Sequence, residues 1–270
     1  MTQTVGVIGA GRMGTPIIGH LVKKGFETRA FDVNAARRAD VETLGASWSS
    51  DLTTLARESD VILICVGFDR EVRELLADAG PLASARKGSI VIILSTVHPK
   101  TIQELAALRA PSGVQVIDST VCRGGEAADK GTLLSFVGGS AEEVARVTPV
   151  LKAYSADVVH TGGIGTAQVA KAANNLILWA CLVADHEALA LAQRFGVDVN
   201  ALRPALMMSS AANDALDKWG KQTMAWAEDD MVIVQEMASE CGLSLPQAGL
   251  NHQICRALKP RKYNLDLYGK

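Results

Sequence analysis

The sequence predicts an α/β fold with a doubly wound, mostly parallel sheet, followed by an all-α domain. In the first half, short β-branched runs alternate with longer helical patterns, as in β–α–β units with right-handed crossovers. After Gly165 no strand pattern recurs, and a stretch without Pro or Gly runs from Thr166 to Arg194. We therefore divide the chain into an α/β domain of residues 1–162 and an all-α domain of residues 163–270.

Six short, apolar and β-branched segments are expected to be strands of this sheet. They are Thr4–Ile8, Thr28–Asp32, Val61–Val66, Ile90–Leu94, Val114–Ile117 and Thr132–Val137. Two of them, Val61–Val66 and Ile90–Leu94, are continuously apolar, which is typical of strands buried on both faces. A helix is expected from Met13 to Lys24, and one long apolar helix over Thr166–Arg194 begins the second domain.

The composition is that of an ordinary globular protein and excludes several classes. The 27 Lys and Arg against 29 Asp and Glu give a net charge of −2, so no basic face for nucleic acid is expected. Five cysteines without a CxxC pair argue against a disulfide framework and against a metal site. No signal-peptide pattern opens the sequence, and its longest apolar runs fall short of the roughly 20 residues that span a bilayer. We therefore expect a cytoplasmic protein that binds neither nucleic acid nor membranes.

A glycine-rich motif follows the first expected strand and opens the first expected helix. Gly9-Ala10-Gly11-Arg12-Met13-Gly14 has the GxGxxG spacing, and this setting favours a dinucleotide-binding fingerprint over an ordinary glycine-rich turn. The first glycine permits a tight turn, the second lets the backbone approach a pyrophosphate, and the third lets helix and strand pack closely. The amino terminus of the helix attracts the anion. The residues predicted to contact the dinucleotide are Gly9, Gly11, Arg12, Met13 and Gly14.

Asp32 is expected to select the cofactor. It ends the second expected strand, where a carboxylate accepts hydrogen bonds from the ribose hydroxyls of NAD and repels the 2′-phosphate of NADP. The alternative is a solvated turn residue, and Arg37 and Arg38 nearby would weaken the discrimination. Val66 and Thr96 lie at the carboxyl ends of the next two strands, at the edge of the sheet where such folds bind ligands, and we assign both to the cofactor site. NAD is thus the expected cofactor, and NADP is less favoured.

The segment Asp118–Gly125 follows another strand and combines small residues, glycines and one arginine. Glycines let backbone amides approach a ligand, and the forked guanidinium of Arg123 suits an anion. Two alternatives remain open for its side chains. Arg123 would then be an ordinary surface arginine, and Cys122 would be an inert thiol, since no activating His and Asp are recognisable beside it.

A polar cluster lies in the otherwise apolar long helix. Lys171 and Asn175 are four residues apart and therefore share one helix face, with Asn174 adjacent. Unpaired polar groups in apolar surroundings are costly, so this cluster needs a functional or structural reason. A lysine partly removed from water loses proton affinity and can serve as an acid or base near neutral pH. The alternative is that Lys171 extends to solvent while the asparagines form local hydrogen bonds.

Taken together, these motifs resemble the β-hydroxyacid dehydrogenase family, the group around 3-hydroxyisobutyrate dehydrogenase. The resemblance covers about the first 190 residues and rests on four ordered motifs. They are Gly6–Pro16, Ser95-Thr96 with Pro99, Asp118–Gly139, and Gly165 followed by Lys171, Asn174 and Asn175. The family implies a Rossmann domain, a long interdomain helix, an all-α domain, and a homodimer or homotetramer.

The resemblance also implies site roles. Lys171 matches the family's catalytic lysine, and Asn175 its substrate-orienting asparagine, with Asn174 beside it. The loop that cradles the substrate carboxylate commonly contains Ser-Gly-Gly; its counterparts here are Cys122, Arg123 and Gly124, and we expect Ser119 to hold the anionic end together with them. Arg123 departs from that pattern and is similar to the sulfolactaldehyde reductase branch, in which an arginine serves an anionic head group. This similarity implies a strongly anionic substrate, either a carboxylate or a sulfonate.

The main hypothesis is an NAD-dependent oxidoreductase that moves a hydride between nicotinamide and a small anionic β-hydroxy acid or its semialdehyde. Lys171 would be the general acid or base. One alternative is a dinucleotide-binding sensor without catalysis, favoured by Asp229 where the family has a lysine. Another is an enzyme similar to the imine reductases, which share this architecture but usually replace the catalytic lysine. Lys171 argues against both alternatives.

Overall fold

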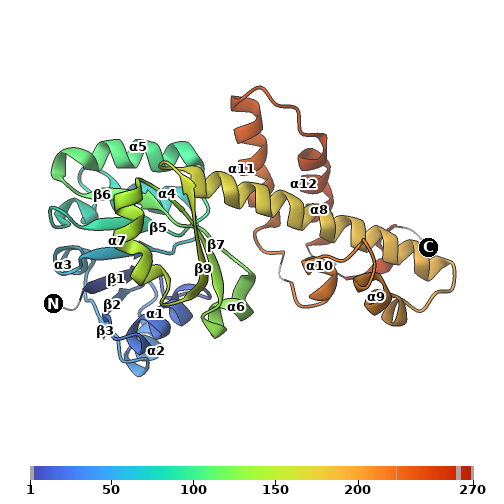
Figure 1. Cartoon of the computed structure of the whole chain (residues 1–270), viewed down its shortest axis with the longest axis horizontal. Helices are drawn as coiled ribbons and strands as arrows, with labels where there is room; N and C mark the ends of the chain where they lie inside the picture. Colours follow the sequence, from blue (N-terminus) through green and yellow to red (C-terminus); the bar gives the residue numbers. More distant parts are fainter. Residues whose placement is uncertain (1–2, 223, 260–262, 269–270) are drawn as a thin grey trace. The chain divides into compact units, whose positions relative to one another are not determined.

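The computed structural model describes residues 3–222, 224–259 and 263–268 (Figure 1). The chain divides into two compact units, residues 1–171 and 172–270. This division falls inside helix α8 (Thr166–Arg194), whereas the boundary expected at residue 162 lies just before that helix. The two divisions therefore differ only in the unit to which they assign the first turns of α8.

Residues 3–171 form a nine-stranded sheet with the order β3-β2-β1-β4-β5-β6-β8-β7, and β9 pairs with β8. The strands are β1 Thr4–Ile8, β2 Glu27–Phe31, β3 Ser47–Trp48, β4 Val61–Ile64, β5 Ile90–Ile93, β6 Gln115–Asp118, β7 Val121–Cys122, β8 Leu133–Gly138 and β9 Ser155–Gly162. Strands β1 to β6 are parallel, and the order reverses between β1 and β4. Strand β8 pairs antiparallel with β6 and β7 and parallel with β9, so β8 and β9 run opposite to the other strands. The doubly wound, mostly parallel sheet is thus confirmed.

The central strands are buried on both faces because apolar side chains alternate between two cores. Val7, Leu63 and Ile92 are register partners on β1, β4 and β5, and all three join one core. The residues that follow each of them along the chain join the other core. This arrangement explains why these strands are continuously apolar in the sequence.

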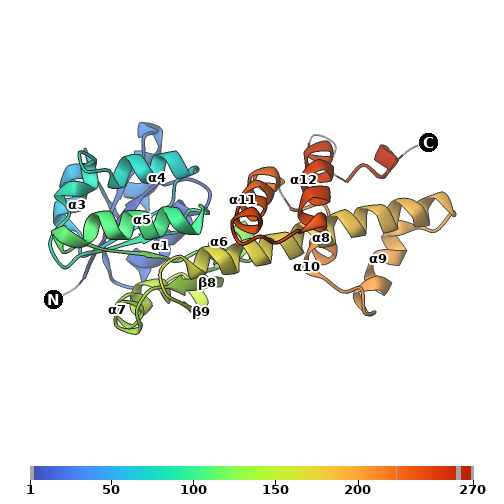
Figure 2. The same ribbon diagram turned by 90° about the horizontal axis from the view of Figure 1, so that it is seen from above.

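Helices cover both faces of the sheet. One core contains residues of α1 (Gly14–Lys23), α2 (Arg38–Thr43), α6 (Gly124–Lys130) and α7 (Ala141–Leu151). The other contains residues of α3 (Leu52–Glu58), α4 (Asp69–Leu76) and α5 (Pro99–Arg109). Figure 2 shows α4 and α5 side by side over that second face. The loops at the carboxyl ends of β1, β2, β4, β5 and β6 contain the predicted dinucleotide and substrate residues of this unit.

Three strands were not predicted. Strand β9 is mostly exposed and polar, so it lacks the apolar run that marks the central strands. Strands β3 and β7 contain two residues each, too few for a periodic pattern. The strand predicted over Val61–Val66 ends at Ile64, because Cys65 and Val66 already belong to the loop that follows.

The predicted long helix is confirmed over its full range, Thr166–Arg194. Beyond it, the described residues form helices only, which confirms the all-α domain. The helices are α9 Val199–Met207, α10 Asp214–Asp217, α11 Ala227–Glu240 and α12 Pro246–Leu258, with a short 3-10 turn at Leu265–Tyr268. Trp179, Leu182 and Val183 of α8 belong to the apolar core of this unit, together with residues of α11 and α12.

Helix α8 also has the length and apolar composition of a membrane-spanning helix. Core helices of soluble proteins share these properties. Trp179 is buried, and its indole N–H donates to the carboxylate of Asp230 on α11 at 2.9 Å. A helix whose side chains make such contacts inside a helical unit has the features of a core helix.

Candidate active site

The glycine motif forms a tight loop between β1 and α1. Gly9 has a φ of 98° and donates its N–H to the carbonyl oxygen of Phe31 at 2.8 Å. A Cβ on Gly9 would overlap the carbonyl oxygen of Cys65, and a Cβ on Gly14 would overlap the carbonyl oxygen of Gly9. Nothing lies within 4 Å of the corresponding position on Gly11. The loop therefore closes tightly at its two ends and leaves open space over its middle glycine.

Asp32 lies directly after β2, and its carboxylate is fixed beside this loop. It accepts the N–H of Ala10 at 2.7 Å and the N–H of Asn34 at 2.8 Å. Arg37 and Arg38 pair with carboxylates three and four residues further along, at 3.7 and 2.8 Å. Both arginines thus have acidic partners on their own segment, while Asp32 remains the acidic group next to the glycines.

The side chain of Arg12 is directed to helix α6. Its two terminal nitrogens each donate to a carboxylate oxygen of Asp129 at 2.7 Å. A Cβ on Gly125 would collide with this guanidinium, so the glycine leaves room for it. Met13 precedes α1 and packs against the adjacent core. This arrangement is compatible with a dinucleotide contact through the Arg12 backbone. The Arg12 side chain instead connects the glycine loop to α6.

The loops after β4 and β5 are joined by side chains that bind backbone groups. The hydroxyl of Ser95 accepts the N–H of Val66 at 3.0 Å and donates to its carbonyl oxygen at 2.9 Å. Gln168 of α8 bonds in the same manner to the loop after β5. Its Nε2 lies 2.8 Å from the Ser95 carbonyl oxygen, and its Oε1 lies 3.0 Å from the Val97 nitrogen. Thr96 lies half-buried between these contacts. Gln168 was not predicted as a site residue, because a lone glutamine in an apolar helix belongs to no recognisable motif.

The end of β6 fixes the first turn of α8. The carboxylate of Asp118 is fully buried and accepts the N–H groups of Gly165 and Gln168 at 2.7 and 3.0 Å. Burial raises the pKa of the Asp118 carboxyl, and these two N–H donors oppose the rise. The hydroxyl of Thr120 donates to the carbonyl oxygen of Ala167 at 2.9 Å. The first turn of α8 is therefore fixed to the end of β6 and the loop that follows it.

The predicted catalytic lysine lies beside the predicted substrate loop. Lys171 Nζ donates to the carbonyl oxygen of Val121 at 2.8 Å and lies 3.8 Å from the Cys122 sulfur. Asn175 follows one turn later on the same helix and is buried. Its side-chain oxygen accepts a hydrogen bond from Asn174 Nδ2 at 3.0 Å. The structure thus brings Lys171 and Cys122 together and places Asn175 next along the helix.

Arg123 and Gly124 adopt left-handed backbone conformations, with φ values of 83° and 76°. This region disfavours L side chains by roughly 1–2 kcal/mol, so Arg123 adopts a conformation that suits the glycine common in the family. Its guanidinium pairs with Asp157 of β9 at 2.7 Å and donates to the carbonyl oxygen of Thr132 at 3.1 Å. The Cβ position of Gly124 is open. The arginine is therefore next to the predicted cradle and paired within the protein.

Like Thr120 next to it, Ser119 is fully buried directly after β6. Its N–H donates to the carbonyl oxygen of Ile93 at 2.9 Å. Its hydroxyl has no hydrogen-bond partner among the described residues. Such a hydroxyl is costly unless another group bonds to it, and the contact of Ser119 with a substrate stays a prediction.

The geometry of the glycine loop fits a dinucleotide. The open Cβ position of Gly11 leaves space for a pyrophosphate against the backbone and the amino terminus of α1. Residues 4–163 match the family described as the NAD binding domain of 6-phosphogluconate dehydrogenase. Residues 165–266 match the NAD-binding region of NADP-dependent 3-hydroxyisobutyrate dehydrogenase. The chain belongs to the β-hydroxyacid dehydrogenase family.

Individual relatives agree with this membership. The 3-hydroxyisobutyrate dehydrogenase of Pseudomonas aeruginosa is 32% identical over 214 residues, 79% of this chain and 72% of the relative. An NAD-dependent L-serine dehydrogenase of the same species is 30% identical over 282 residues, 97% of this chain and 94% of the relative. The structure of Mycobacterium tuberculosis 3-hydroxyisobutyrate dehydrogenase with L-serine shares the fold, with a TM-score of 0.87 and 24% identity over 99% of this chain and 97% of that one. The chain is an NAD(P)-dependent dehydrogenase that acts on CH–OH groups.

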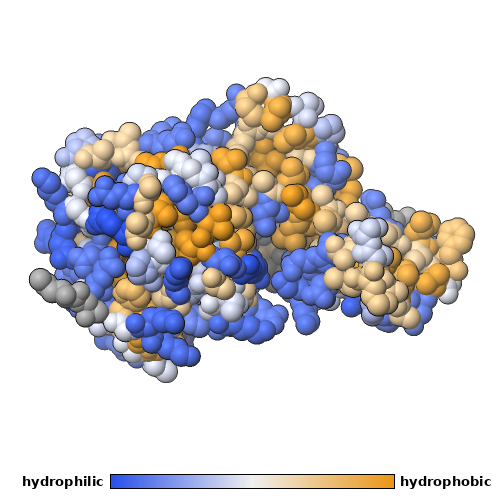
Figure 3. Space-filling view, viewed as in Figure 1, coloured by the Kyte–Doolittle hydropathy of each residue, from blue (hydrophilic) through white to orange (hydrophobic). Residues whose placement is uncertain are grey.

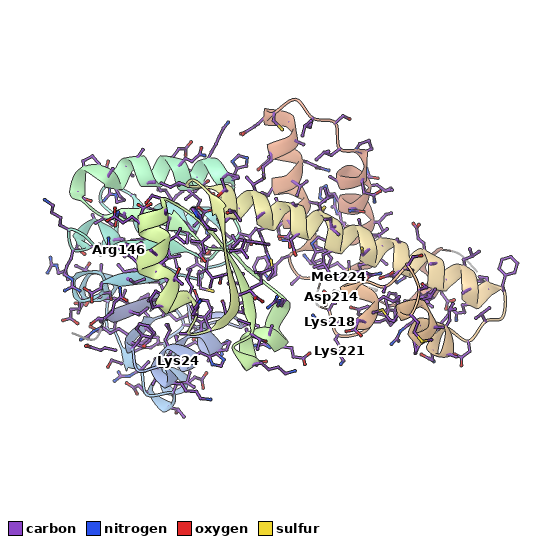
Figure 4. The ribbon with its side chains drawn as sticks, in the orientation of Figure 1. Lys24, Arg146, Asp214, Lys218, Lys221 and Met224 are labelled. Carbon is purple, nitrogen blue, oxygen red and sulfur yellow. The ribbon has the colours of Figure 1, made fainter. Side chains whose placement is uncertain are left out.

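This β-hydroxyacid dehydrogenase also has a cavity of about 260 Å³ far from the glycine loop along the strands. Asp60, Arg86, Ser89 and Arg146 contribute to its lining, and Figure 4 shows Arg146 on α7. Asp60 and Ser89 directly precede β4 and β5, so the cavity lies at the amino edge of the sheet. Because open α/β sheets bind ligands at the carboxyl edge, we do not assign the active site there. Among the described residues, no group of three or more His, Cys, Asp or Glu is placed to hold a metal.

Proposed function

We propose that this β-hydroxyacid dehydrogenase uses NAD and acts on a small anionic β-hydroxy acid or the corresponding semialdehyde. The position of Lys171 carries the proposal, with its amine 2.8 Å from the carbonyl oxygen of Val121, in the loop that resembles the family's carboxylate cradle. The relatives named above are 3-hydroxyisobutyrate and L-serine dehydrogenases, and both of these compounds are β-hydroxy acids.

Lys171 would transfer the proton. The bound dinucleotide supplies the hydride acceptor for oxidation and the hydride donor for reduction. In oxidation the neutral Lys171 amine accepts the proton of the substrate hydroxyl, and in reduction the ammonium donates it to the carbonyl oxygen. Such general acid–base catalysis accelerates reactions roughly 10²–10⁴-fold.

Asn175 and the loop around Gly124 would orient the substrate. The Asn175 amide, one turn beyond Lys171, bonds to the reacting oxygen. Arg123 and the open backbone at Gly124 bind the anionic end, with Asn174, Cys122 and Ser119 completing the polar surroundings. Attachment at two points fixes the reacting carbon, which removes much of the entropic cost of reaching the transition state.

A substrate screen tests the proposed function. NAD(H) absorbance would be followed at neutral and alkaline pH with small 3-hydroxy acids, semialdehydes and hydroxysulfonates. We expect turnover with at least one anionic member of this set and much weaker turnover with neutral alcohols of the same size. If protein that binds NADH turns over none of them, the proposed substrate class is wrong.

The first prediction concerns the cofactor. The wild-type enzyme should have a kcat/KM at least tenfold higher with NAD than with NADP, because Asp32 lies beside the glycine loop and repels a 2′-phosphate. Asp32→Asn should reduce this preference, mainly through the KM for NADP. Asp214→Asn is a matched control, since its exposed carboxylate pairs with Lys218 in the helical unit. A wild-type preference of tenfold or more for NADPH would contradict the proposal.

The second prediction concerns Arg123. The Arg123–Asp157 pair is exposed by 42% and 55% on its two side chains, and such pairs contribute only about 0–1 kcal/mol. A substrate anion can therefore displace Asp157 at small cost. Arg123→Ala should raise the KM for anionic substrates roughly tenfold with little change in kcat, and Asp157→Asn should lower that KM. Equal KM values in wild type and Arg123→Ala would show that the arginine only anchors the loop to β9.

Asp229, where the family has a lysine, is the feature that favours a sensor without catalysis. Asp229 is exposed, whereas Asp230 is buried and accepts the Trp179 indole N–H, so the pair Asp229-Asp230 includes a core contact. Lys171 is present, and its amine is positioned by the protein. A sensor without catalysis would not require this arrangement, and imine reductases usually have another residue in place of the lysine.

A homodimer or homotetramer remains part of the proposal. The helical unit exposes several large apolar side chains, and the outer end of α8 and α9 is largely apolar in Figure 3. The most exposed of these side chains are Ile177, Leu191, Phe195 and Met208. Exposed apolar side chains gathered on one unit are typical of association surfaces. Sedimentation or light scattering of the purified protein would measure the assembly.

A further inference from the structure

The side chain of Gln168 is 1% exposed, and both of its amide atoms bond to one short loop. Nε2 donates to the carbonyl oxygen of Ser95, and Oε1 accepts the N–H of Val97. These two backbone groups flank Thr96, so the glutamine amide binds the loop on both sides of this residue. A buried polar side chain that satisfies two buried backbone groups fixes their positions closely.

The backbone of Gln168 is held equally firmly. Its N–H donates to the buried carboxylate of Asp118, and the carbonyl oxygen of Ala167 accepts the hydroxyl of Thr120. Lys171 follows three residues later and lies on the neighbouring position of the same helix face. The Thr96 loop and the amine of Lys171 are thus attached to one fixed turn of α8.

The Ser95 hydroxyl extends the constraint to the loop after β4. It bonds to both backbone groups of Val66, the other residue of these two loops assigned to the cofactor. A continuous series of hydrogen bonds therefore runs from α8 through Ser95 to Val66. Each member is a side-chain-to-backbone contact of 2.8 to 3.0 Å.

We propose that Gln168 is a positioning residue that fixes the cofactor-side loops, through Ser95 and Val97, relative to Lys171. The proposal rests on the proposed function only for the role of Lys171 and for the assignment of Thr96 and Val66 to the cofactor. Gln168 itself would touch neither substrate nor cofactor, and its effect would pass through the loop that it holds.

Gln168→Leu tests the proposal directly, because leucine fills a similar space but cannot bond to Ser95 or Val97. NADH affinity would be measured by fluorescence well below the melting temperature, and amide hydrogen exchange would be measured for residues 94–98. We expect the Kd for NADH to rise about tenfold, exchange in this segment to accelerate, and kcat to fall at least tenfold. Ser95→Ala breaks the next contact and should weaken NADH binding in the same direction.

Gln168→Glu provides a conservative rescue with its own readout. A protonated carboxyl has one donor and one acceptor, as the amide has, whereas the ionised form has no donor for the Ser95 carbonyl oxygen. Burial favours the protonated form, as does the carboxylate of Asp118, while Lys171 nearby favours the ionised form. NADH affinity of this variant should approach the wild-type value at pH 6 and fall as pH rises to 9. The Gln168→Leu variant should show no such recovery.

Ser135→Ala is the matched control. It removes another fully buried hydrogen bond, from Ser135 to the hydroxyl of Ser155 at 2.8 Å, on strands β8 and β9. If Ser135→Ala and Gln168→Leu weaken NADH binding equally, or if Gln168→Leu binds NADH as wild type does, the positioning role is wrong. The binding and exchange measurements need no turnover, so they remain decisive even if the substrate screen overturns the proposed function.

Discussion

Replacing Lys171 with alanine is expected to lower kcat at least a hundredfold and to leave NADH affinity within about twofold of wild type. The side chain would supply the only proton donor or acceptor in the proposed reaction, whereas the dinucleotide contacts assigned above come from other residues. Steady-state rates with the preferred hydroxy acid and NADH fluorescence titration measure the two quantities separately. A loss in kcat with unchanged cofactor binding is typical of an interaction made in the transition state.

Two further variants make this prediction specific. Lys171→Arg keeps a positive charge near Val121 and Cys122, but a guanidinium does not release its proton in this pH range, so turnover should remain low. Lys152→Ala removes an exposed lysine at the end of α7 and should leave both quantities unchanged. Turnover close to wild type in Lys171→Ala would rule out the lysine as general acid or base.

The sheet could be predicted from the sequence because its signal is local. Strands such as β4 and β5 are buried on both faces, so their runs of Val, Ile and Leu have no polar interruption. The glycine motif was equally accessible because its GxGxxG spacing lies within six residues, although the carbonyl oxygen that excludes a Cβ on Gly9 belongs to the distant Cys65. Strand β9 gave no such signal, because an exposed edge strand needs no apolar run.

The contacts between distant segments could not be predicted. Asp118 and Gln168 are 50 residues apart, and neither residue type in isolation indicates a partner. The same holds for Arg12, which was predicted to face the cofactor and pairs with Asp129, 117 residues away. Arg123 was recognised as a departure from its family, but its ion pair with Asp157 depends on how β9 adds to the sheet. Such pairings follow from tertiary geometry, which sequence spacing does not encode.

Two alanine substitutions in the glycine loop, Gly14→Ala and Gly11→Ala, are expected to differ in their effects on stability and on NADH binding. Gly14→Ala places a Cβ on the carbonyl oxygen of Gly9, so the start of α1 must shift. We expect this variant to lose NADH binding and to melt several degrees below wild type, since displaced backbone at a helix start costs on the order of 1–3 kcal/mol. Thermal melting without ligand and NADH titration measure both effects.

Gly11→Ala should separate binding from folding. Its Cβ would enter space that no protein atom occupies within 4 Å, so the free protein should melt at the wild-type temperature or slightly above it. If that space belongs to the pyrophosphate, the methyl group must exclude it, and the Kd for NADH should rise at least tenfold. Unchanged NADH affinity in Gly11→Ala would mean that the phosphates do not approach the middle of this loop. A fall in both melting temperature and affinity would mean that the loop is closed by contacts other than those at Gly9 and Gly14.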